Sequence, residues 1–103
     1  MKLTKNVISR DEAMKLAPDY VRYAEHEEGC WDILFDKIMP LFEKLKRGQK
    51  VLTYETLDEV YVVCKVSSIN HNDIRAVDGP IVRVGNGEYT WRVDGDGYAY
   101  PLE

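Results

Sequence analysis

The spacing of the apolar residues changes near residue 50, and this change constrains the fold more than any other feature of the chain. In residues 31–48, apolar side chains recur three and four positions apart, which is the period of an amphipathic helix. In residues 50–102, short β-rich runs alternate with turn residues such as Gly, Asn and Asp. A chain that is helical first and stranded afterwards is typical of the α+β class.

The length of 103 residues and the short junction "KRGQKVL" predict a single domain, 1–103, with a helical part at 1–48 and a β part at 49–103. The hydrophobic fraction of 45% is ordinary for a globular protein, so a core can form without disulfides or metals. We therefore expect an α+β fold in which about three N-terminal helices pack on a small antiparallel sheet, or on an SH3-like barrel, of roughly five or six short strands.

Start and break signals divide the helical half. Ser9 followed by Glu12 is a capping box, which predicts a short helix over residues 10–17. Pro18 either kinks this helix or begins a second one, because a missing N–H is harmless in a first turn. Pro40 interrupts the apolar stripe of the third helix. Since the stripe continues in phase across it, we expect a kink or break there, with both pieces on one core.

In the β half, the run "EVYVVCKVSSI" carries apolar residues on both faces, which is typical of a central strand. Turns are expected at "NHND" (70–73) and "GNG" (85–87), and short strands at "IRAV" and "IVRVG". The last two strands are expected in "EYTWRV" and "YAYPL", with Trp91 facing the core.

The stretch from Asp94 to Gly97, which includes Asp96, resembles part of a calcium loop. An EF-hand also needs a third oxygen ligand, a distal Glu and flanking helices, none of which follows here. The two glycines are better explained as turn residues that reach positive φ. We therefore expect a hairpin at this position, with no bound metal and no cofactor.

Two cysteines and two histidines raise the question of zinc or of a nucleophilic pair. The spacings of Cys30 and Cys64 from His26 and His71 do not match the usual zinc motifs. Cys64 lies in a buried strand pattern, where a packed thiol is the simpler reading. Cys30 would be a catalytic nucleophile only if the fold brought it to His71 or His26.

Charge and hydropathy disfavour several classes. Residues 1–50 hold ten Lys and Arg against nine Asp and Glu, whereas residues 51–103 hold four against nine. The aromatic half is thus the acidic half, which disfavours nucleic-acid binding. The start "MKLTKNVISRDEA" has no apolar core of a signal peptide, and no run approaches the length of a membrane span. We expect a cytoplasmic protein without membrane contact.

No G-x-S-x-G, P-loop or dinucleotide-binding motif is present, so a binding module is favoured over an enzyme. The candidate contact residues for a protein partner lie in the last hairpin: Tyr89, Tyr98, Tyr100, Asp94 and Asp96. Their acidic character suits a partner with a basic surface, or a second copy of the chain. A regulator or inhibitor of a larger protein machine, such as a phage or mobile-element accessory protein, fits this description.

A second hypothesis is a small-ligand or nucleotide-binding domain, with hydrolytic activity as an extension. It would need His71, Asp73 and Asp94 to converge from separate turns beside an aromatic-lined barrel mouth. The alternation of the aromatics leaves open whether Tyr98 and Tyr100 complete the core or face a partner. The sequence therefore predicts a binding protein, with the class of its ligand unresolved.

Overall fold

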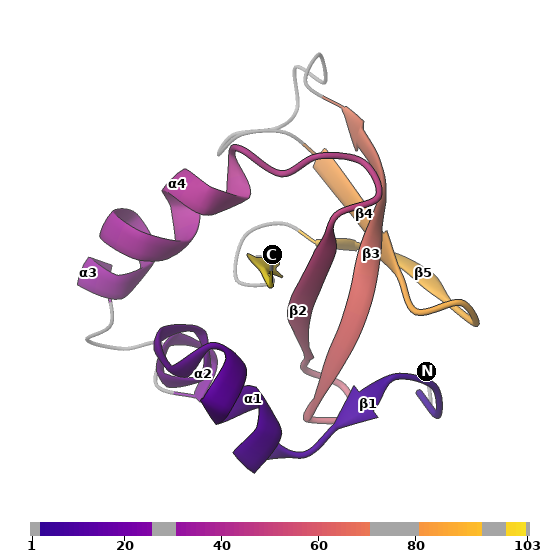
Figure 1. The fold of residues 1–103 in the computed structure, drawn as a ribbon, viewed down its shortest axis with the longest axis horizontal. Helices are drawn as coiled ribbons and strands as arrows, with labels where there is room; N and C mark the ends of the chain where they lie inside the picture. Colours follow the sequence, from indigo (N-terminus) through magenta and orange to yellow (C-terminus); the bar gives the residue numbers. More distant parts are fainter. Residues whose placement is uncertain (1–2, 26–30, 71–80, 94–98, 103) are drawn as a thin grey trace.

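The computed structural model describes residues 3–25, 31–70, 81–93 and 99–102. Helices occupy the first half and an antiparallel sheet the second (Figure 1). This order confirms the predicted α+β class. One element lies outside the expected pattern: the two-residue strand β1 (Val7–Ile8), which precedes the helices and pairs with the sheet.

The first two helices are α1 (Arg10–Leu16) and α2 (Pro18–Glu25). The Ser9 hydroxyl accepts a hydrogen bond from the Glu12 backbone N–H at 3.1 Å, so the predicted cap is present. Pro18 is the first residue of α2. At this position a backbone N–H would have no partner within the helix, so its absence costs nothing. Of the two readings of Pro18, the start of a second helix is the one observed.

The third helical segment is broken into α3 (Trp31–Ile33), the π-helical turn η1 (Leu34–Ile38) and α4 (Met39–Phe42). The π turn ends at Ile38, two residues before Pro40. Proline has no N–H to donate to the helix, and its ring clashes with the carbonyl one turn earlier. Prolines and π turns are both common causes of helix bending. The break that the sequence places at Pro40 is thus spread over the preceding turn.

The apolar phase survives this break, as predicted. Ile38, Phe42 and Leu45 are all buried. The helix ends earlier than the sequence suggested, at Phe42, and the following residues form turns. Gly48 has a φ of 87° in the turn that leads into the sheet, a conformation that favours glycine.

The remaining strands form one antiparallel sheet in the spatial order β5-β4-β3-β2-β6. β1 pairs with Tyr61 and Val62 near the start of β3, before the part of β3 that pairs with β4. The strands are β2 (Lys50–Glu55), β3 (Val60–Asn70), β4 (Ile81–Gly85), β5 (Thr90–Val93) and β6 (Tyr100–Pro101). Among the described residues β5 and β6 do not pair with each other, so the sheet is open. The open sheet, not the barrel, is therefore observed, and β3 is central as expected.

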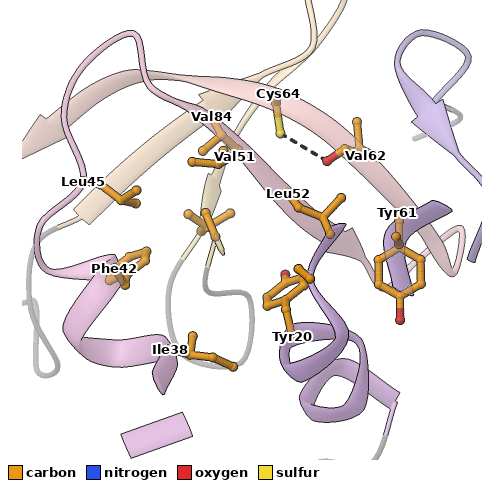
Figure 2. Close-up of a cluster of buried hydrophobic side chains, with 14 of the residues drawn as sticks. Tyr20, Ile38, Phe42, Leu45, Val51, Leu52, Tyr61, Val62, Cys64 and Val84 are labelled. Carbon is orange, nitrogen blue, oxygen red and sulfur yellow. Dashed lines mark hydrogen bonds between the residues drawn. The ribbon is translucent and has the colours of Figure 1, made fainter. Parts of the chain in front are cut away.

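The core lies between the helices and the sheet, and Figure 2 shows its central side chains. Val51, Leu52 and Thr53 are consecutive in β2 and all fully buried, so this strand is covered on both faces. The Tyr20 hydroxyl oxygen accepts a hydrogen bond from the Tyr54 backbone N–H at 2.9 Å, which ties α2 to β2. Helices and strands therefore share one hydrophobic core.

Candidate functional site

A groove of about 600 Å³ opens where the N-terminal segment meets β3 and the turn between β4 and β5. Its charged lining residues are three lysines, Lys5, Lys50 and Lys65, and no described acidic residue lines it. This composition contrasts with the chain as a whole, which carries a formal net charge of −4. We define these three residues with their surroundings as the lysine groove.

Strand register explains why two of the lysines meet. Four residues of neighbouring strands lie side by side in one row across the sheet: Lys50 of β2, Lys65 of β3, Gly85 of β4 and Thr90 of β5. Directly opposed residues of an antiparallel sheet project from the same face, so this row forms one wall of the groove. Like charges in opposed positions destabilise a sheet.

The third lysine comes from the N-terminal segment, which a pair of asparagines holds against the sheet. The Asn6 side-chain amide donates to the Asn86 carbonyl at 2.8 Å, and the Asn86 amide donates to the Lys5 carbonyl at 2.9 Å. The Val63 backbone N–H also donates to the Asn6 carbonyl at 2.9 Å. Asn6 has a φ of 62°, a region that asparagine enters more readily than most residues. We call this reciprocal pair the asparagine clasp.

The same Asn86 shapes the turn that borders the groove. Its side-chain oxygen accepts hydrogen bonds from the backbone N–H groups of Glu88 and Tyr89, at 2.9 and 2.8 Å. Gly87 follows with a φ of 94°, and a Cβ there would lie 2.8 Å from the Lys5 Nζ atom. The turn predicted at "GNG" is confirmed, and its second glycine leaves room for the Lys5 side chain.

Two of the groove lysines are not neutralised by described carboxylates. Arg10 forms an ion pair with Glu25, and Lys37 forms one with Asp19. Within the described part of the chain, no carboxylate lies at salt-bridge distance from Lys5 or Lys65. Their ammonium groups are therefore available to an external anion.

A second polar cluster has a structural role. The Arg10 Nε atom donates to both carboxylate oxygens of Glu25, at 2.9 and 2.8 Å, and the Tyr61 hydroxyl donates to Glu25 at 2.7 Å. Burial, followed by the hydrogen bond to Glu25, raises the pKa of Tyr61. These contacts connect α1, α2 and β3. The cluster therefore joins the helical layer to the sheet.

The site residues predicted from the last hairpin are only partly within the described residues. Tyr89 is 39% exposed in the turn between β4 and β5. Tyr100 is half-buried, and its ring lies 5.8 Å from that of Tyr20, so it contributes to the core and keeps an exposed part. Trp91 is likewise half-buried against the core. The other predicted contacts, Tyr98, Asp94 and Asp96, and the hairpin expected at 94–97 lie outside the described residues.

The residues of the enzymatic hypothesis also lie largely outside the described part, namely His26, Cys30, His71 and Asp73. Cys64 is described, and it is buried with its Sγ atom 3.3 Å from the Thr53 hydroxyl. Burial raises the pKa of the Cys64 thiol to about 11. Because the thiolate is the reactive form, Cys64 is an inert core residue near neutral pH. No cluster of His, Cys, Asp or Glu suited to a metal occurs among the described residues.

The raised pKa of Cys64 predicts a loss of stability at alkaline pH. An unfolded thiol ionises near pH 8.5, whereas the folded thiol holds its proton until about pH 11. Between these values the unfolded state binds fewer protons, so the free energy of unfolding falls as pH rises. We expect urea denaturation to show the stability advantage of wild type over Cys64→Ala shrinking from pH 7.5 to pH 10. A difference that stays constant with pH would contradict this assignment.

Comparisons with protein-family models, curated proteins and solved structures found no match to the chain. The groove must therefore be interpreted from its own chemistry. None of the helices in the described residues has the length and apolar character that crossing a membrane requires.

The sequence alone did not point to the lysine groove. Lys5, Lys50 and Lys65 are far apart along the chain, and the residues directly beside each of them are uncharged. Their proximity depends on strand register and on the asparagine clasp, neither of which follows from periodicity. The available signal was Asn86 between two glycines, a turn that permits close approach of another segment.

Proposed function

We propose that the protein is a non-catalytic binding module and that the lysine groove holds an anionic ligand. The observation that carries the proposal is the gathering of Lys5, Lys50 and Lys65 around one cavity whose described lining contains no carboxylate. The ammonium groups of Lys5 and Lys65 have no described carboxylate at salt-bridge distance, so a shared counter-charge would stabilise them. Such a group in an otherwise acidic chain is better explained by binding than by solubility.

The size of the groove supports a discrete ligand. Its volume of about 600 Å³ falls within the range of typical small-molecule sites. A long polyanion would also pass over the rest of the surface, where the net charge of −4 opposes it. We therefore propose a compact anion as the ligand, in place of a nucleic acid.

This proposal keeps the class expected from the sequence, a binding module, but replaces the expected protein partner with a compact anion. The sequence favoured a binding module acting on a protein with a basic surface, through Tyr89, Tyr98 and Tyr100. Of these, Tyr100 is half-buried against Tyr20. The role of these tyrosines in binding a protein, and a regulatory or inhibitory function, stay predictions.

Thermal unfolding in a panel of anions tests the proposal. Sulfate, citrate and tripolyphosphate would be compared at an ionic strength held constant with sodium chloride. At one hundred times its dissociation constant, a bound anion adds about 2.7 kcal/mol of stability, which raises the Tm by roughly 10 °C or more for a domain of this size. We expect at least one polyvalent anion to stabilise the wild type beyond the chloride control.

Two charge reversals locate the effect. Lys65→Glu is expected to abolish the stabilisation, because it places a carboxylate in the groove. Lys44→Glu is the matched control, since Lys44 is exposed, is not part of the groove lining, and its reversal changes the net charge equally. If no anion stabilises the wild type, or if both variants respond alike, the groove is not an anion site.

A further inference from the structure

We infer that the ligand of the lysine groove is a small phosphate monoester, whose phosphoryl group is bound by Lys5, Lys65 and Thr90. This inference rests on the proposed function and specifies the chemistry of the ligand. Its evidence is a set of three donor side chains that have no described partner and that reach the groove from three different segments.

Two ammonium groups and one hydroxyl group of the groove have no described partner. No carboxylate of the described residues lies at salt-bridge distance from Lys5 or Lys65. The Thr90 hydroxyl makes no hydrogen bond to another described residue. Lys50 also lines the groove, but it has an interaction of its own within the protein, so its charge does not enter the balance. A ligand therefore meets two unmatched positive charges and one further donor.

The two unmatched charges indicate a dianion. A phosphate monoester carries a charge of about −1.5 to −2 at neutral pH, which balances the ammonium groups of Lys5 and Lys65. A carboxylate has a single negative charge and would leave one ammonium group unmatched. One phosphoryl group is thus sufficient for the charge of this site.

The three donors come from the N-terminal segment, from β3 and from β5. Gly85 lies between Lys65 and Thr90 in the row across the sheet and has no side chain that would separate them. A phosphoryl group has three terminal oxygens, so each can accept from one donor. No described arginine, whose planar fork matches the two oxygens of a carboxylate, lines the groove.

Gly87 positions the ammonium group of Lys5. Its φ is 94°, and a Cβ there would lie 2.8 Å from the Lys5 Nζ atom. The ammonium group therefore fills space that a side chain at this position would take.

The rest of the groove has room for the organic part of an ester. Its volume of about 600 Å³ exceeds what a phosphoryl group fills and is within the range of small-molecule sites. Val63 is half-buried and also lines the groove, so it offers an apolar contact. A free phosphate ion would leave this space and this side chain unused.

Isothermal titration calorimetry at pH 8, with phenyl phosphate, phenyl sulfate and phthalate at matched ionic strength, tests the inference. Phenyl sulfate keeps the ring and the tetrahedral group but has one charge fewer, whereas phthalate places two charges on planar carboxylates. We expect phenyl phosphate to bind the wild type about ten-fold more tightly than either.

Side-chain variants locate the phosphoryl group. Lys5→Gln and Lys65→Gln are each expected to weaken phenyl phosphate about five-fold or more, and Thr90→Val about three-fold or more. Lys44→Gln, outside the groove lining, should change the affinity by less than about two-fold. Circular dichroism of each variant checks that its fold is retained.

Gly87→Ala has a matched control in Gly48→Ala. Gly48 has a similar φ of 87°, but no atom lies within 4 Å of the position of its Cβ. Both variants strain the backbone, and we expect only Gly87→Ala to weaken phenyl phosphate, because it displaces the Lys5 ammonium group. Equal affinities of the two variants would overturn the placement of Lys5 at the phosphoryl group.

The remaining outcomes separate the inference from the proposed function. Inorganic phosphate binding as tightly as phenyl phosphate would overturn the ester in favour of free phosphate, and tighter binding of a phosphoserine peptide would overturn it in favour of a modified protein segment. Phthalate binding as tightly as phenyl phosphate would overturn the phosphoryl group and leave the anion site intact. Absence of binding by every probe, tripolyphosphate included, would overturn the proposed function itself.

Discussion

Replacing Phe42 with alanine is expected to lower the free energy of unfolding by about 3 to 5 kcal/mol, the usual range for a buried phenylalanine. Phe42 ends α4, is 1% exposed, and packs in the core that the helices share with the sheet (Figure 2). Truncation would leave a cavity at the point where the segment turns toward β2. Urea denaturation followed by circular dichroism measures the change.

Leu41 provides a neighbouring control. It is 37% exposed in the same helix, so Leu41→Ala should destabilise the protein by less than half as much. Because a loss of 5 kcal/mol approaches the whole stability of many domains, Phe42→Leu serves as a milder variant that keeps most of the packing. Equal effects of Phe42→Ala and Leu41→Ala would contradict the helix phase described after the π turn.

Replacing Asn86 with alanine is expected to cost about 2 to 3 kcal/mol and to weaken anion binding. Its side chain makes three hydrogen bonds, one to the Lys5 carbonyl and two from the turn that it closes, each worth about 1 kcal/mol. Asn86 is only 2% exposed, so water cannot easily replace all of them. Losing the clasp would also release Lys5 from the groove.

Asn86→Asp separates the two roles of this side chain. The aspartate keeps an oxygen that can accept both hydrogen bonds of the turn, but it cannot donate a hydrogen bond to the Lys5 carbonyl. We expect it to preserve the hairpin and to weaken tripolyphosphate binding, through the freed N-terminal segment and through its negative charge. Asn6→Ala removes the reciprocal bond without adding charge, and it should weaken binding in the same direction. Unchanged affinity in Asn6→Ala would show that the clasp does not position Lys5.

The elements that the sequence predicted well have strong local signals. The cap at Ser9, an interruption of the helix at Pro18 and the central position of β3 all follow from short-range chemistry. The early end of the third helix at Phe42 could not be read from a stripe that continues to Leu45, because turn residues can place apolar side chains on the same core. β1 was missed because a two-residue strand has no detectable period and exists through its pairing with Tyr61 and Val62.

The candidate site was harder to predict than the fold because it depends on tertiary pairing. Opposition of Lys50 to Lys65 requires a specific register, and a shift of one residue would place one lysine on the other face. Lys5 reaches the groove through contacts with Asn86, about eighty positions away in the sequence. Net charge averaged over each half of the chain conceals this local basic cluster. The aromatic hairpin, in contrast, stands out in the sequence for its composition alone.

Titration of ¹⁵N-labelled protein with tripolyphosphate, followed by amide chemical shifts, tests the central claim most directly. If the lysine groove is the ligand site, the largest shifts will occur at Lys5, Lys65 and the turn from Gly85 to Gly87, and they will saturate with a single dissociation constant. The same titration of Lys65→Glu should leave these amides unmoved. Shifts absent from the groove, or concentrated elsewhere on the chain, would contradict the assignment of this groove as the binding site.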